Sequence, residues 1–86
     1  MSFDPGLAGG MGVMAAVVDS GSFARAADSL EITPSGVSRA ISRLEKRLGI
    51  RLFDRTTRAV QLTDEGRRSY QEIAPLLAGL EDAANA

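Results

Sequence analysis

Residues 22–49 read SFARAADSLEITPSGVSRAISRLEKRLG, and this stretch predicts two helices joined by a tight turn. The first helix is expected over residues 23–30, behind Ser22, whose hydroxyl can cap it. Its apolar residues are Phe23, Ala26, Ala27 and Leu30, and the two alanines are small enough to let a crossing helix come close. The second helix is expected over residues 34–48, because Thr33-Pro34 is a strong helix start and Gly49 is a common helix end. Only residues 31–33 remain for the turn.

The predicted helix 34–48 has two chemically different faces. Its apolar residues step by four, three and four and fall on one side, which we expect to face the core: Val37, Ile41, Leu44 and Leu48. The opposite side mixes short hydroxyls with long cations: Ser35, Arg39, Ser42 and Lys46, flanked by Ser38, Arg43 and Arg47. These are the parts of a helix-turn-helix, whose second helix enters the major groove of DNA. The solvated side of any small helical domain has the same composition, so helix 34–48 alone leaves both interpretations open.

A short β-hairpin is predicted directly after this helix. Residues 50–53 and 59–62 have the composition of short strands, and the polar tip between them, 54–58, carries Arg55 and Arg58. In a winged domain such a tip reaches DNA phosphates or the adjoining minor groove, and narrow A·T-rich minor grooves attract arginine. The helix pair and the basic tip together favour nucleic-acid binding.

Two further helices are predicted on either side of this region. Upstream, apolar residues at helical spacing predict a helix from Leu7 to Asp19, although several glycines weaken its first turns. Downstream, Thr63 and two acids suit a helix start, and heptad-spaced residues follow: Tyr70, Ile73, Leu77, Leu80 and Ala84. This narrow seam predicts pairing with a second copy of the chain. The alternative is that the stripe folds back on the upstream helix of its own chain, and both uses can coexist.

Composition narrows the class of protein. With 86 residues, 44% hydrophobic and 24% charged, the chain is expected to be one small globular domain. No apolar run is long enough to span a bilayer and no segment resembles a signal peptide, so the default expectation is a cytoplasmic protein without membrane contact. The absence of Cys and His excludes disulfides, thiolate nucleophiles, the usual zinc sites and Ser-His-Asp catalysis. We therefore expect no catalytic residues, no metal and no cofactor.

The net charge of −1 is unusual for a nucleic-acid binder, but the charges are unevenly distributed. Residues 22–62 contain eight bases and four acids, a net charge of +4, whereas the remainder contains two bases and seven acids, a net charge of −5. A basic middle between acidic flanks predicts that one face of the molecule meets an anionic polymer.

The chain resembles the amino-terminal signature of LysR-type transcriptional regulators. The matching positions are Gly21-Ser22-Phe23, Ala26-Ala27, Leu30, Thr33, Val37-Ser38-Arg39, Ile41, Leu44-Glu45, Leu48-Gly49, Leu52-Phe53, Arg55, Leu62-Thr63 and Gly66. The resemblance implies a mainly α fold with a small β-hairpin, namely a winged helix-turn-helix over residues 1–63 followed by a linker helix over 64–86 that dimerises. It also implies a separate effector-binding domain, which the sequence given does not contain, so we expect a DNA-binding part of a longer regulator.

The resemblance also implies partners and DNA contacts. The expected partners are a DNA operator with an interrupted palindrome and a second copy of the chain, with a tetramer expected for the full-length protein. A small-molecule effector is expected to bind only the other domain. The expected location is the bacterial cytoplasm, at the nucleoid. DNA contacts are implied for Pro34, Ser35, Gly36, Ser38 and Arg39, with Arg55 and Arg58 at the wing, and phosphate contacts for Ser22 and Arg25. Ser42 and Arg43, on the outer side of the same helix, complete the expected interface. Many family members have Gln-Pro where this chain has Pro34-Ser35, so their adenine preference does not carry over.

Three other functions are weighed against DNA binding. A winged helix used for protein–protein contact should show aromatic or aliphatic anchors, and the outer face of helix 34–48 has none. An enzyme would need a carboxylate pair, whereas Glu45 and Glu65 are predicted to lie singly on helix surfaces. Single-strand RNA modules stack bases on aromatic residues, of which this chain has few.

Overall fold

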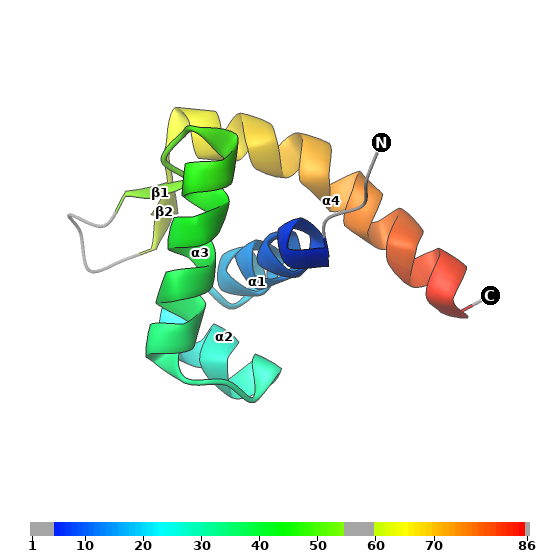
Figure 1. Cartoon of the computed structure of the whole chain (residues 1–86), viewed down its shortest axis with the longest axis horizontal. Helices are drawn as coiled ribbons and strands as arrows, with labels where there is room; N and C mark the ends of the chain where they lie inside the picture. The colour runs from blue at the N-terminus through cyan, green and yellow to red at the C-terminus, as the bar shows by residue number, and fades with distance from the viewer. Residues whose placement is uncertain (1–4, 55–59, 86) are drawn as a thin grey trace.

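The computed structural model describes residues 5–54 and 60–85 and consists of helices with one small hairpin (Figure 1). The elements in chain order are α1 (Pro5–Ser20), α2 (Phe23–Leu30), α3 (Pro34–Leu48), β1 (Phe53–Asp54), β2 (Gln61–Leu62) and α4 (Asp64–Asn85). Helix α1 lies in the middle and packs against α2, α3 and α4, while β2 of the hairpin contacts α4. This arrangement confirms the predicted mainly α fold with a small hairpin and a long last helix.

The bounds of α2 and α3 are those predicted, because the expected caps form. The Ser22 hydroxyl accepts a hydrogen bond from the Arg25 amide at 3.2 Å, and the Thr33 hydroxyl accepts one from the Gly36 amide at 3.0 Å. Helix α3 ends at Gly49, whose φ of 73° is the left-handed conformation that glycine adopts without steric cost. Local hydrogen bonds therefore fix both helices of the motif.

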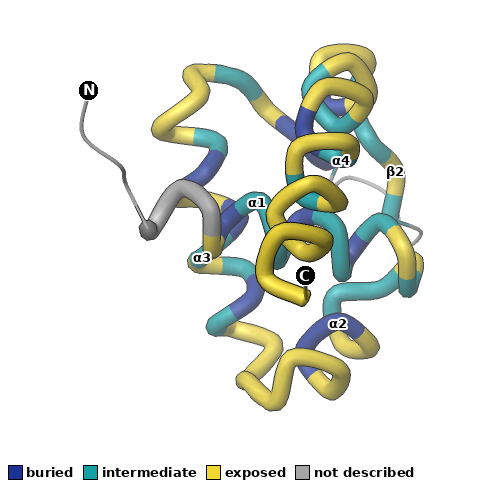
Figure 2. Tube along the Cα trace, turned by 90° about the vertical axis from the view of Figure 1, so that its right-hand side faces the viewer, coloured by how far each residue is buried: buried dark blue, intermediate teal, exposed yellow. Residues whose placement is uncertain are grey.

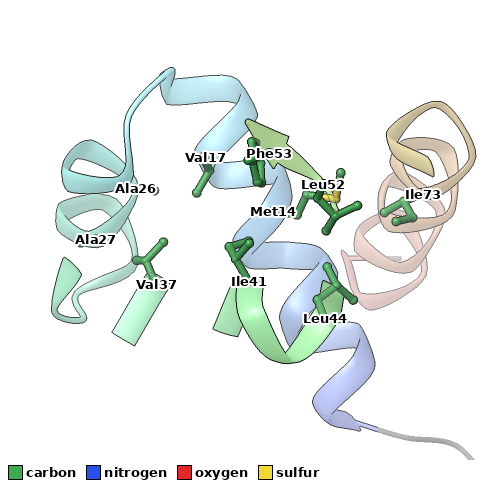
Figure 3. Close-up of a cluster of buried hydrophobic side chains, with 10 residues drawn as sticks. All are labelled: Met14, Val17, Ala26, Ala27, Val37, Ile41, Leu44, Leu52, Phe53 and Ile73. Carbon is green, nitrogen blue, oxygen red and sulfur yellow. The ribbon is translucent and has the colours of Figure 1, made fainter. Parts of the chain in front are cut away.

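The core is a single cluster in which α1 supplies the centre (Figure 3). Its buried side chains are Met14, Val17, Ala26, Ala27, Val37, Ile41, Leu44, Leu52, Phe53 and Ile73. Phe23 and Phe53 meet edge to face, with ring centroids 5.7 Å apart, which ties the start of α2 to the first strand. The apolar face predicted for α3 is thus confirmed for three of its four residues.

Several predicted details are wrong. Leu48, expected inside, is more than a third exposed, because it is the last residue of its helix, where the chain turns away from the core; Leu30, at the end of α2, is exposed to a similar extent. Helix α1 begins at Pro5 rather than Leu7 and ends at Ser20 rather than Asp19.

The strands are also shorter than predicted. Among the described residues of the hairpin, the paired ones are Phe53 with Leu62 and Asp54 with Gln61, in antiparallel register. Residues 50–52 are not part of the strand: the Leu52 carbonyl still accepts from the Thr63 amide opposite it, but the Leu52 amide donates to the Glu45 side chain instead of to the second strand. Residue 59, predicted to start the second strand, lies outside the described residues.

Candidate nucleic-acid interface

The turn between α2 and α3 fixes the angle at which α3 is presented. Glu31 adopts left-handed angles (φ 58°, ψ 39°), and the amide of Ile32 donates to the Ala27 carbonyl at 3.0 Å. Ala26 and Ala27 are buried, and their small side chains allow α2 to pack closely on its neighbours. The three-residue turn is therefore a defined structure rather than a loose connection.

The outer face of α3 is open to solvent while its inner face is fixed in the core. Pro34, Ser35, Arg39, Ser42 and Arg43 are exposed, and Gly36 and Ser38 are half-buried on the two flanks. Within the described residues, Arg39 and Arg43 form no ion pair, so their guanidinium groups are free to contact a ligand. The structure thus brings the seven predicted α3 residues to one accessible surface with rigid support behind it.

The front of α3 is organised by the Thr33 hydroxyl. This oxygen accepts from the Gly36 amide and lies 3.3 Å from the Ser35 hydroxyl. A β-carbon at position 36 would lie only 3.1 Å from the same oxygen, so a glycine leaves this corner unfilled. The first turn of α3 therefore presents a small hydroxyl beside a position without a side chain, which permits close approach of a base edge.

The two α2 residues predicted to contact phosphate differ in their availability. Ser22 is half-buried, and its hydroxyl already accepts from the Arg25 amide. The Arg25 side chain is exposed and, within the described part of the chain, makes no ion pair. The other predicted contacts, Arg55 and Arg58 in the tip 54–58, lie outside the described residues, as do most of the residues of that tip.

Hydrogen bonds between residues 45 and 66 link the end of α3, the hairpin and the start of α4. The sequence did not predict these bonds. The Glu45 carboxylate accepts from the Leu52 amide at 2.8 Å, and the Leu52 carbonyl accepts from the Thr63 amide at 3.0 Å. The Thr63 hydroxyl accepts from the Gly66 amide at 2.9 Å and donates to the Arg51 carbonyl. Gly66 lies so close to Leu52 that a β-carbon there would be 2.1 Å from the Leu52 carbonyl oxygen.

Glu45 and Glu65, the two carboxylates considered for catalysis, are not placed together as an acid–base pair would be. Glu45 binds a backbone amide, which is a structural role, and Glu65 is exposed in the first turn of α4. This leaves no paired carboxylates at these two positions. The sequence gives only one indication that Glu45 binds the Leu52 amide, namely that Glu45 lies seven residues before Leu52. Many other hydrogen-bond partners of Glu45 are compatible with its position in the sequence.

The apolar residues of α4 lie in two environments: some pack on the rest of the chain and others face solvent. Ile73 is buried in the core of its own chain, and the Tyr70 hydroxyl donates to Asp19 of α1 at 3.2 Å. Burial, and then the nearby Asp19 carboxylate, raise the pKa of Tyr70 above its usual 10.0. The expectation that Ile73 belongs to a seam facing a second copy is therefore wrong, because α1 packs against this part of α4 and covers it.

Farther along, α4 extends beyond the other helices and is exposed (Figure 2). Leu77 is half-buried against the core, whereas Leu80 and Ala84 of the predicted seam are exposed. Leu76, which was not predicted, is 64% exposed, and Leu80 one turn later is 54% exposed. Two large apolar side chains thus share one open side of the helix.

No helix in the described residues is long and apolar enough to cross a membrane. Nor do those residues bring three His, Cys, Asp or Glu side chains together in a group able to hold a metal ion.

Comparison with known proteins gives consistent matches. A family model described as bacterial regulatory helix-turn-helix protein, lysR family, matches residues 10–67. An HTH-type transcriptional repressor of Pseudomonas aeruginosa is 44% identical over 72 residues, covering 84% of this chain and 23% of the relative. The HTH-type transcriptional regulator CrgA of Neisseria meningitidis is 46% identical over 65 residues, covering 76% of this chain and 22% of CrgA. The chain thus spans about a quarter of the length of these curated relatives.

Among solved structures, the crystal structure of the BenM_DBD in complex with benA site 1 DNA superimposes with a TM-score of 0.85. The two chains are 37% identical, and the match covers 91% of this chain and 88% of the other. A match of that extent includes most of α4.

Proposed function

The chain belongs to the LysR family of bacterial regulatory helix-turn-helix proteins, and from this premise we propose that it binds double-stranded DNA sequence-specifically to regulate transcription. The observation that carries the proposal is the outer face of α3, where hydroxyls and unpaired arginines are exposed on a helix whose other side is locked in the core. The DNA complex of the similar BenM domain supports the same function.

The chemistry of the α3 surface suits the major groove. Arginine can donate two hydrogen bonds to O6 and N7 of guanine, and serine hydroxyls can serve several base edges. We assign base reading to the exposed Arg39 with Ser35 and Ser38, because they lie near the front of α3, and backbone contact to Arg43. Arg25 on α2 and the wing arginines, Arg55 and Arg58, would hold phosphates or the adjoining minor groove.

A protein–protein module fits this surface less well. Docking surfaces have buried aromatic or aliphatic anchors at their centre, and the outer face of α3 offers none among its described residues. An enzymatic role has no support either, since both curated relatives are named as regulators and Glu45 is engaged with the Leu52 amide.

We further propose that α4 pairs with α4 of a second copy through its exposed apolar side. Leu76 and Leu80 are one turn apart and largely exposed, which leaves apolar area in water unless another helix covers it. A dimer of this kind would place two α3 helices on one DNA duplex and match an operator with an interrupted palindrome.

Pairing through α4 is tested by the sedimentation of Leu80→Glu beside the control Gln71→Glu, which adds the same charge at an exposed position on the opposite side of the helix. Leu80→Glu should yield monomers and weaken binding to a two-half-site operator far more than to one half-site. Gln71→Glu should remain dimeric. A Leu80→Glu chain that stays dimeric, or a wild-type chain that stays monomeric at high concentration, contradicts the pairing.

Because the relatives are about four times longer than this chain, we propose that sensing of a small-molecule effector and assembly into a tetramer belong to other parts of the whole protein. A protein that regulates transcription in a bacterium acts at the chromosome, so we place it in the cytoplasm at the nucleoid.

DNA recognition is tested by selecting ligands of the 86-residue chain from a library of random duplexes and then comparing variants on the selected site and on random DNA. Arg39→Ala should cost about 1–3 kcal/mol on the selected site and much less on random DNA, because a lost base contact removes discrimination. Arg68→Ala, which removes an exposed cation from α4, should leave the ratio of the two affinities unchanged. Failure to enrich any sequence, or equal losses for Arg39→Ala on both DNAs, contradicts the proposal.

A further inference from the structure

We propose that Ile32, in the turn before α3, is a specificity-determining residue that contacts the 5-methyl group of a thymine across the space left by Gly36. The inference rests on the proposed DNA-binding function and adds an apolar base contact to it. Neither the family resemblance nor the charge pattern of α3 points to this residue.

The first observation is the exposure of Ile32. Its side chain is 44% exposed although it is one of the larger aliphatic residues of the chain. It immediately precedes Thr33, the N-cap of α3, where an apolar residue commonly packs on the first turn of the helix. Packing on the helix accounts for the covered part of the side chain and leaves the exposed part without a partner in the described residues.

The second observation is the position of Ile32 beside Gly36. A β-carbon at Gly36 would lie 3.8 Å from Cδ1 of Ile32 and 3.9 Å from its Cβ, which are ordinary van der Waals distances between carbon atoms. The Ile32 side chain therefore borders the surface that the missing side chain of Gly36 leaves open, with the Thr33 hydroxyl on its other side. Since Gly36 has no side chain, a methyl group of DNA can approach the backbone at this point, and the Ile32 beside it, more closely than it could if residue 36 were larger.

The third observation is the chemistry of the neighbouring residues. Ser35 and Arg39 are exposed on the adjoining side of α3 and offer polar groups only. In the major groove, thymine is marked by its 5-methyl group, which is read by apolar contact. Ile32 would add that contact at the front of a helix whose other readers are polar, and α3 would then recognise a thymine next to the bases that Arg39 and the serines contact.

The test combines one change in the protein with one in the DNA. Thymines of the selected duplex are replaced one at a time by deoxyuridine, which lacks only the methyl group, and affinities are measured for wild type, Ile32→Val and Ile32→Ala. For wild type, one position in each half-site should lose about three- to fivefold in affinity, the factor expected for one buried methyl group. Ile32→Val, which lacks Cδ1, should lose less at that position, and Ile32→Ala should be indifferent to the methyl group.

Leu30→Ala is the matched control, because Leu30 is a comparably exposed aliphatic residue two positions earlier, and none of the three atoms nearest to a β-carbon at Gly36 belongs to it. It should keep the full thymine-to-uridine ratio. Partial unfolding of a variant lowers both affinities equally and leaves this ratio intact. A wild-type ratio near one at every position, or a ratio that Ile32→Ala leaves unchanged, overturns the inference while specific binding stands. Absence of any specific binding by wild type overturns the proposed function itself.

Discussion

Replacing Gly66 by alanine should destabilise the domain strongly, although alanine is the better helix former. The new methyl group would lie 2.1 Å from the carbonyl oxygen of Leu52 and 2.9 Å from its Cα and carbonyl carbon. These are backbone atoms, and they cannot move alone, because the Leu52 amide is bound to Glu45 and the Leu52 carbonyl accepts from Thr63. Either α4 moves away from the hairpin or these hydrogen bonds break.

The expected size follows from three contributions. Overpacking costs about 1–3 kcal/mol, and each disrupted hydrogen bond costs about 1 kcal/mol more. The helical preference for alanine over glycine returns about 1 kcal/mol. We expect a net loss of about 2–4 kcal/mol, a large share of the roughly 5–10 kcal/mol typical of a domain of this size.

Urea unfolding followed by circular dichroism measures this loss directly. Gly12→Ala is the matched control, because Gly12 is inside α1 and a β-carbon there would meet nothing within 4 Å. The control should be as stable as wild type or gain up to about 1 kcal/mol. If Gly66→Ala unfolds at the same urea concentration as Gly12→Ala, the close approach of α4 to Leu52 is refuted.

Three further predictions concern other parts of the chain. Glu31→Gly should raise the unfolding free energy by about 0.5–1 kcal/mol, because glycine adopts left-handed angles without the steric cost that Glu31 bears, and a less stable variant in urea would contradict this. Since the folded-state pKa of Tyr70 is raised, its contribution to stability is present below about pH 10 and is lost above it. Tyr70→Phe should therefore flatten the fall in unfolding free energy between about pH 9 and pH 11. Equal slopes for the two proteins would exclude a contribution from the contact of Tyr70 with Asp19. Arg58→Ala should lower the slope of log affinity against log salt by about one unit and weaken sites with A·T-rich flanks most, whereas unchanged affinity at low and high salt would show that Arg58 does not contact DNA.

The helix-turn-helix could be predicted from sequence because its boundaries are set locally. Ser22, Thr33 and Gly49 each act on amides or carbonyls within four residues, so their chemistry identifies the ends of α2 and α3 without knowledge of the rest of the fold. The polar face of α3 could be predicted in the same way, because the helical period of about 3.6 residues places its polar and apolar residues on opposite sides.

The connections between distant segments could not be predicted in the same way. The bond from Glu45 to Leu52 and the contact of Gly66 with the Leu52 carbonyl depend on where the chain returns in space. The heptad pattern of α4 had a similar limit. Apolar spacing shows that one side of a helix is covered, but it does not show whether α1 of the same chain or a second molecule covers it, and Ile73 is covered by its own chain.

The attachment of α4 at Leu52 has a mechanical consequence. Leu52 is bonded through its amide to α3 and through its carbonyl to Thr63, the residue before α4, so Leu52 directly links the base of α4 to α3. The 22 residues of α4 make an arm about 33 Å long. A change of only about 6° at its base would move its far end by about 3.4 Å, the rise of one base pair. In the proposed dimer, small changes in packing at the base of α4 would therefore be magnified into differences of about one base pair in the spacing between the two α3 helices.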